Sequence, residues 1–193
     1  AIYHFLFRSL AAMTGPQSED ELEELALETG RMMIAAMDLL DRAHLAAYGI
    51  PEITRIPLGT RNRPGILISG HDLADLEELL LQTAGTGIDV YTHCEMWAAH
   101  QYPRFKEFPH LAGNYGNAWW MQDLEFATFN GPVLVTSNCI IPVAPAYRNR
   151  IFTTHSGDGN WNIYPIRAVR EGDWKYLRNL HPEFAFTTHI DLP

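Results

Sequence analysis

Hydrophobic residues recur at helical spacing near the start of the chain. Ser18 and Glu21 have the pattern of a capping box, in which a serine and a glutamate three residues later cap one helix start. Beyond them, apolar residues return every three or four positions and acidic residues lie between them. This pattern predicts a helix that ends near residue 47, before Gly49 and Pro51. Residues 1–13 resemble the end of another helix, so we expect residues 1–50 to be a helical segment.

The pattern changes after Pro64. Residues 65–69 are a short apolar run typical of a buried parallel strand. We expect further strands at residues 88–91 and 132–136, and helices at residues 72–82 and 118–129. Strands and helices that alternate at this spacing predict an α/β fold with a Rossmann-like parallel sheet over residues 51–150. Residues 69–72 contain one glycine where the dinucleotide-binding fingerprint needs two or three, so no nucleotide site is predicted there.

The end of the chain is rich in β-forming residues. Residues 163–169 and 174–180 are two such runs, and the polar turn at residues 170–173 between them suggests a hairpin. We therefore predict three parts: the helical segment 1–50, the Rossmann-like domain 51–150 and a β-rich tail 151–193.

Charge and composition narrow the classes of partner. The 193 residues include 14 Lys and Arg against 23 Asp and Glu, for a formal net charge of −9. An acidic chain without a basic cluster repels phosphate backbones, so we expect no nucleic-acid partner. No apolar run approaches the roughly 18 residues of a membrane span, so we expect no membrane partner. Two cysteines, Cys94 and Cys139, cannot form a disulfide framework, which favours a reducing, cytoplasmic location.

Three potential metal ligands follow the three predicted parallel strands. They are His71, Glu95 and Cys139, one after each strand. Ligands of open parallel sheets bind beyond the carboxyl ends of the strands, so neighbouring strands would bring these side chains to one place. Mixed nitrogen, oxygen and sulfur ligation suits iron or zinc. The alternative is that each residue has an ordinary structural role, as a loop histidine, a helix-capping glutamate and a buried thiol.

Other polar residues lie close to the predicted ligands. His93 and Cys94 compete with the neighbouring carboxylate for a place at the site. His100, His110 and Tyr115 in the following loop are candidate hydrogen-bond donors to the ligands. For both of these histidines we favour an ordinary place on a surface loop.

Several ordered motifs resemble the hybrid-cluster protein (prismane, hydroxylamine reductase) family. The similarity runs from about residue 18 to residue 154, on motifs at residues 66–73, 75–80, 90–96, 113–116 and 136–142. The resemblance implies that His71, Glu95 and Cys139 match three ligands of the family's hybrid iron–sulfur–oxygen cluster. It also implies that small N–O compounds are the substrates. Hydroxylamine is reduced to ammonia, nitric oxide is a second substrate, and a separate donor supplies the electrons.

The chain also departs from that family. The resemblance implies an N-terminal cysteine cluster for a second iron–sulfur centre, and further cysteines and a glutamate that complete the hybrid cluster; the 193 residues contain neither. Cys94 stands where the family usually has glycine. Three ligands do not hold a four-iron cluster alone, so we expect a partial ligand set and an inactive fragment.

The tail has a second resemblance, to the C-terminal region of sulfatases. Residues 153–158, 164–170, 174–176 and 179–184 carry it, but the sulfatase nucleophile motif is not found, because residues 139–144 lack its arginine. We hypothesise a chimera joined at residues 151–154. A sulfatase-derived hydrolase remnant and a non-catalytic, degenerate module are therefore the alternative functions. A sheet interrupted at this junction is expected to self-associate through its unfinished face.

Overall fold

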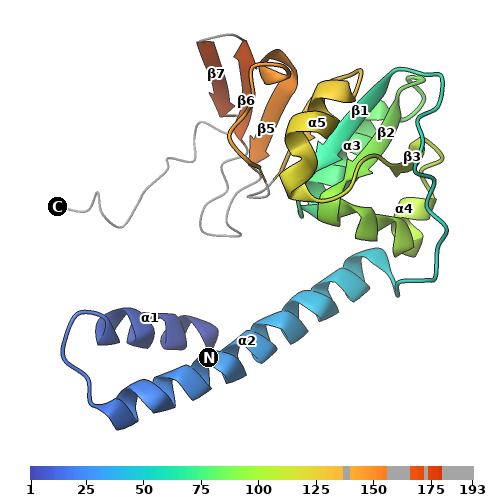
Figure 1. Cartoon of the computed structure of the whole chain (residues 1–193). Helices are drawn as coiled ribbons and strands as arrows, with labels where there is room; N and C mark the ends of the chain where they lie inside the picture. The colour runs from blue at the N-terminus through green and yellow to red at the C-terminus, as the bar shows by residue number, and fades with distance from the viewer. Residues whose placement is uncertain (137–139, 156–165, 172–173, 180–193) are drawn as a thin grey trace. The chain divides into compact units, whose positions relative to one another are not determined.

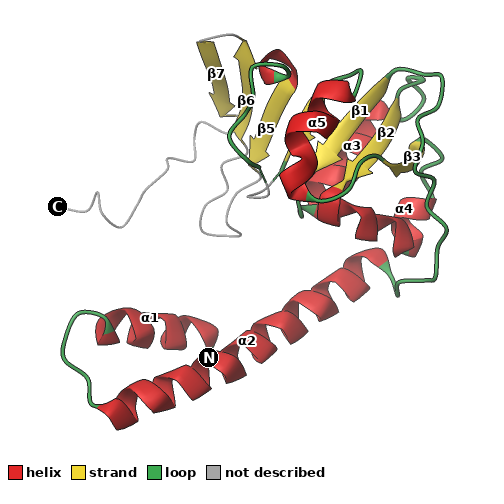
Figure 2. Cartoon of the chain, viewed as in Figure 1, coloured by secondary structure: helices red, strands yellow, loops and turns green. Residues whose placement is uncertain are grey.

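The computed structural model describes residues 1–136, 140–155, 166–171 and 174–179. The chain divides into two compact units, residues 1–51 and residues 52–193. Figures 1 and 2 show a pair of helices in the first unit and a sheet with helices in the second.

The helical unit contains α1 (Ile2–Ala12) and α2 (Glu19–Tyr48). The predicted capping box is confirmed: the Ser18 hydroxyl accepts a hydrogen bond from the backbone of Glu21, and the Glu21 carboxylate accepts one from the backbone N–H of Ser18 at 2.8 Å. Gly49 ends α2 with φ of +88°, a conformation that glycine adopts without steric cost. An ion pair between Arg8 and Glu28 joins the two helices.

The second unit is built on one seven-stranded sheet. The strand order is β3-β2-β1-β4-β5-β6-β7. The first five strands are parallel, and β6 and β7 form an antiparallel hairpin that continues the sheet beyond β5. The strands are β1 (Gly65–Ser69), β2 (Asp89–His93), β3 (Leu111–Asn114), β4 (Val133–Val135), β5 (Ile151–His155), β6 (Ile166–Glu171) and β7 (Trp174–Asn179).

Helices cover both faces of the parallel part of the sheet (Figure 1). The β1-to-β2 and β3-to-β4 connections run in opposite directions along the sheet, so right-handed crossovers put α3 and α5 on opposite faces. The core on the α5 face includes Leu67, Tyr91 and Phe126, each at most 1% exposed. The helices are α3 (Leu73–Thr83), η1 (Cys94–Gln101), α4 (Pro103–Lys106), η2 (Trp119–Met121), α5 (Gln122–Thr128) and η3 (Arg148–Arg150).

The predicted α/β class, with a Rossmann-like parallel sheet after a helical segment, is confirmed. Two parallel strands, β3 and β5, add to the three that the sequence predicts. The sequence of β3, Leu-Ala-Gly-Asn, has neither an apolar run nor alternation, which explains why its pattern does not stand out. Across the described ranges, none of the helices combines the length and apolar character needed to cross a lipid bilayer.

Candidate metal centre at the carboxyl edge of the sheet

The central strand β1 marks the point where the strand order changes direction. From β1 the chain proceeds to β2 and β3 on one side, and then returns to add β4 and β5 on the other side. In open α/β sheets the crevice outside the carboxyl ends of strands at such a point is the usual ligand site. The three predicted metal ligands follow β1, β2 and β4, and the structure confirms that these strands are neighbours.

His71 and Glu95 meet at this edge of the sheet. The imidazole Nε2 of His71 contacts the carboxylate Oε2 of Glu95, although the two residues are 24 positions apart in sequence. Ser69 and His93, the last residues of β1 and β2, are paired in register, so the two donors start from equivalent backbone positions two residues further on.

A residue with positive φ precedes each of the two donors. Gly70 has φ of +133° and Cys94 has φ of +57°. These turns lead from buried strand ends to exposed side chains, since the side chain of His71 is 41% exposed and that of Glu95 is 62% exposed. The result is an imidazole nitrogen and a carboxylate oxygen that lie together at a solvent-accessible edge, which is a pair of donors suited to a transition metal.

The third predicted ligand, Cys139, lies outside the described residues. The segments on either side of it are anchored next to the site. The backbone N–H of Thr136 donates to the carbonyl of Ser69 at 3.0 Å, and the backbone N–H of Ile141 donates to Oε1 of Gln122 at 3.1 Å. Among the described residues, no group of three or more His, Cys, Asp and Glu side chains is placed to hold a metal ion.

A buried hydrogen-bonded network lies at the ends of β1 and β2, two residues before His71 and Glu95. Nδ1 of His93 is 2.9 Å from the Ser69 hydroxyl, and its Nε2 is 2.8 Å from Oε2 of Glu125 on α5. The other oxygen of Glu125 accepts from the backbone N–H and the side-chain amide of Asn117, at 2.9 and 3.0 Å. Ser69 and His93 are completely buried, and Glu125 is 7% exposed.

The pKa shifts of His93 and Glu125 determine where the protons of this hydrogen-bonded network lie. Burial lowers the pKa of His93, against the opposing effect of Glu125. Burial alone would raise the pKa of Glu125, but the hydrogen bonds from His93 and Asn117 outweigh it and lower that pKa. At neutral pH Glu125 is therefore a carboxylate that only accepts, so Nε2 of the neutral His93 ring carries the hydrogen and Nδ1 accepts from Ser69.

This hydrogen-bonded network has the residue types of a serine hydrolase triad, but its serine is not accessible to a substrate. A nucleophilic serine must reach its substrate, whereas the Ser69 hydroxyl is buried and donates to the histidine. The structure agrees with the lack of a nucleophile elbow around Ser69 in the sequence.

The expectation of a surface loop is wrong for one of the two histidines of the following segment. His100 is 7% exposed, and its Nε2 lies 3.0 Å from the hydroxyl of Thr92, which in turn donates to Asn114. His110 is partly buried, with its Nε2 3.0 Å from the carbonyl of Leu80. Burial lowers the pKa of His100 to about 4, against a smaller opposing effect of a backbone hydrogen bond.

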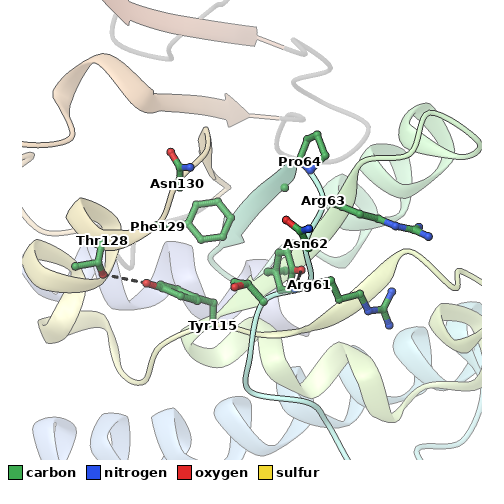
Figure 3. A pocket seen from close by; sticks show the side chains of 11 residues that line it. Arg61, Asn62, Arg63, Pro64, Tyr115, Thr128, Phe129 and Asn130 are labelled. Carbon is green, nitrogen blue, oxygen red and sulfur yellow. Dashed lines mark hydrogen bonds between the residues drawn. The ribbon is translucent and has the colours of Figure 1, made fainter.

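A cavity of about 630 Å³ lies beside the start of β1 and the end of α5 (Figure 3). Aromatic side chains, including Tyr115 and Phe129, form part of its wall, and the Tyr115 hydroxyl is 2.9 Å from that of Thr128. Arg61 and Arg63 also line it, but each lies within 4 Å of the buried carboxylate of Asp89. The lining contains no His, Cys, Asp or Glu, so this cavity is not a candidate metal site.

Sequence reasoning missed the part that Glu125 has in this arrangement. Its position on the inward face of a short helix, next to Phe126, was the available signal, because a carboxylate at a buried helix position needs a partner. The partner could not be read from the pattern, since His93 lies 32 positions earlier.

Comparison with known proteins gives one consistent result. The sequence profile of the Prismane/CO dehydrogenase family matches residues 1–162. A hydroxylamine reductase of Chlorobaculum tepidum is 58% identical over 153 residues, which are 79% of this chain and 28% of that protein. A hydroxylamine reductase of Clostridium perfringens is 64% identical over 137 residues, which are 71% of this chain and 25% of that protein. The chain thus spans about a quarter of the length of these relatives.

The comparisons do not support the sulfatase resemblance of the tail. The match to the family profile continues to residue 162, beyond residue 154 where the sequence motifs end. Much of the tail, at residues 156–165, 172–173 and 180–193, lies outside the described residues.

Proposed function

Because this chain belongs to the Prismane/CO dehydrogenase family, we propose that it is part of a hydroxylamine reductase-type oxidoreductase and that its carboxyl edge supplies ligands to an iron–sulfur–oxygen cluster. The substrates are small N–O compounds, hydroxylamine first and nitric oxide second. The 193 residues hold only part of the ligand set, so they are inactive by themselves.

One observation carries this proposal. His71 and Glu95, which the sequence resemblance assigns to the cluster, touch each other at the carboxyl edge. The contact brings a nitrogen donor and an oxygen donor, 24 positions apart in sequence, together at an exposed edge, as shared ligation of a metal requires.

The donor set fits an iron cluster with accessible metal sites. His71, Glu95 and Cys139 would hold it, through an imidazole nitrogen, a carboxylate oxygen and a thiolate sulfur, and Thr136 anchors the segment leading to the thiol next to β1. When bound, such a cluster supplies electrons and an open iron position for an N–O substrate.

The chain's own residues support the site in two ways. The fixed strand ends hold the two donors together, which reduces the rearrangement that metal binding requires. The exposure of both donors leaves room for the remaining ligands and for the substrate. Hydroxylamine reduction breaks the N–O bond and consumes two electrons and two protons, with ammonia and water as products. The electrons come from a donor outside this chain.

Iron binding by the 193-residue chain tests the ligand assignment. We expect wild-type protein to bind Fe²⁺ under anaerobic conditions at these three ligands without assembling the complete cluster. The variants His71→Ala, Glu95→Gln and Cys139→Ser should each lower bound iron by about tenfold or more. His110→Ala is the matched control, because it removes a partly buried imidazole that contacts Leu80 and Thr83 on α3. Wild-type protein that takes up no more iron than the Cys139→Ser variant would overturn the assignment.

A transplant tests the activity. The 153 residues of this chain that align with the Chlorobaculum tepidum enzyme replace the matching 28% of that enzyme, and hydroxylamine reduction is measured together with iron content. We expect the hybrid to reduce hydroxylamine and its His71→Ala version to lose that activity, whereas its His110→Ala version keeps it. A hybrid with full iron content and no activity would contradict the proposed function.

A further inference from the structure

Hydrogen bonds that start from the carboxylate of Glu125 connect four separate elements. The residue lies on α5 and bonds His93 at the end of β2, which continues the chain of bonds to Ser69 at the end of β1. Its second oxygen holds Asn117, in the loop that follows β3. One side chain therefore joins the carboxyl ends of β1 and β2 to the loop after β3.

The two strand ends that Glu125 joins are those that carry the candidate ligands. Ser69 and His71 are two residues apart, as are His93 and Glu95. Between each pair lies one residue with positive φ, so little backbone separates the buried bond from the exposed donor. A shift of His93 relative to Ser69 therefore changes the separation of the two donors.

The packing around Glu125 leaves its carboxylate little freedom. A Cβ at Gly116 would lie 2.6 Å from Oε2 of Glu125 and 3.0 Å from the His93 ring, so the loop after β3 lies flush against the pair. Phe126 packs edge-on against the same imidazole, with ring centroids 4.9 Å apart. The His93 ring is thus held by two hydrogen bonds and by contacts from α5 and the loop after β3.

We infer that Glu125 is a positioning residue for the metal centre: through His93 and Ser69 it fixes the ends of β1 and β2, and so sets the distance between the ligands His71 and Glu95. The inference rests on the proposed metal centre for its functional meaning. Glu125 itself is 7% exposed and acts through His93.

Two variants distinguish whether Glu125 acts through its hydrogen bonds or through its negative charge. In Glu125→Gln, the side-chain oxygen still accepts from Asn117, and the amide NH₂ faces Nε2 of His93. The ring then becomes an acceptor at Nε2 and donates from Nδ1 to Ser69, so every bond survives and only the two bonds of the His93 ring reverse direction. In Glu125→Ala, His93 loses its partner and Asn117 loses its anchor.

The first experiment measures Fe²⁺ affinity of the 193-residue chain and the ¹⁵N shifts of the His93 ring. We expect Glu125→Ala to bind Fe²⁺ about 10–100-fold more weakly, as for other residues that orient metal ligands. We expect Glu125→Gln to bind close to wild type while its His93 ring signals report the other tautomer. A carboxylate that acts through its negative charge would instead lose affinity in Glu125→Gln as well as in Glu125→Ala.

The second experiment needs no metal. Amide hydrogen exchange at residues 70–72 and 94–96 should be faster in Glu125→Ala than in wild type, and near wild type in Glu125→Gln. Ser69→Ala, which removes a single buried hydroxyl and keeps the His93–Glu125 bond, is the milder variant if Glu125→Ala does not fold. It should show a smaller acceleration at the same residues.

A control separates positioning from general stability. Leu76→Val shortens a completely buried side chain on α3 and should lower the urea midpoint of unfolding without changing iron affinity or local exchange. Glu125→Ala that binds iron and exchanges like wild type would overturn the inference. If wild-type protein binds no iron, the proposed metal centre fails, and the exchange data still decide whether Glu125 fixes the two strand ends.

Discussion

The two units of this chain use their helices in contrasting ways. In the helical unit, α2 is 30 residues long and buries none of them. In the α/β unit, α3 is 11 residues long and buries five. Both helices have a capped start and an amphipathic pattern, so these local signals specify that a helix forms but do not reveal how much of it is buried. Burial decides how much a substitution costs.

The largest difference should come from removing one large apolar side chain from each unit. Phe126→Ala deletes a ring that is completely buried between His93 and Tyr147, so we expect a loss of about 3–5 kcal/mol in unfolding free energy. Leu27→Ala removes a side chain that is 59% exposed and should cost less than about 0.5 kcal/mol. Urea unfolding measures both changes.

Two spectroscopic probes separate the units in that experiment. All five tryptophans lie in the second unit, so fluorescence follows its unfolding, while far-ultraviolet circular dichroism also follows α1 and α2. Equal losses for the two variants would show that the contrast in burial does not determine their stability.

Acid should weaken the α/β unit through its buried histidines. His100 has a pKa of about 4 in the folded chain and about 6.5 when unfolded, so its contribution is complete above pH 6.5 and is lost as the pH falls toward 4. The fluorescence-detected free energy of unfolding should therefore fall by up to about 1.4 kcal/mol per pH unit over that range. His93, whose pKa is also lowered by burial, adds to the slope in the same direction.

The His100→Gln variant tests which residue is responsible. The metal-free variant should show a shallower slope between pH 6.5 and 4, because the remaining change comes from His93. An unchanged slope would assign the acid sensitivity to other groups.

The smallest effect concerns the stability of glycine relative to alanine at one position in each unit. We expect the order of stability to be opposite at the two positions. Gly30 lies inside α2 with open space around it, so Gly30→Ala should stabilise the helix by about 1 kcal/mol. At Cys94, where φ is +57°, a glycine variant should instead be more stable than an alanine variant by about 1 kcal/mol. Thermal unfolding of the four proteins measures the ranking, and the same order at both sites would contradict the left-handed conformation at Cys94.

The sequence predicted the elements that carry strong local signals. The capped helix α2, the apolar strand β1 and the β6–β7 hairpin all follow from periodicity and turn residues. The adjacency of His71 and Glu95 was also accessible, because ligands at the ends of parallel strands converge once the strands are neighbours. The boundaries at residues 50 and 150, the assignment of His71, Glu95 and Cys139 as ligands, and self-association stay predictions.

Other features depend on contacts that no local pattern encodes. The burial of His100 follows from packing against the sheet, and its sequence neighbours do not distinguish it from a loop histidine. Glu125 and His93 become partners only when α5 lies across the sheet. The exposed face of α2 has the same periodicity as a buried one.

The strand order also determines when each candidate ligand can reach its place during synthesis. His71 and Glu95 can do so earlier than Cys139. His71 and Glu95 follow the consecutive strands β1 and β2 and are 24 residues apart, so a nascent chain can bring them together soon after β2 has emerged. The bond from Thr136 to Ser69 closes a loop of more than sixty residues and waits for β3, α5 and β4. Closing the longer loop costs more chain entropy. The His71–Glu95 pair can therefore form before the segment that bears Cys139 is in place.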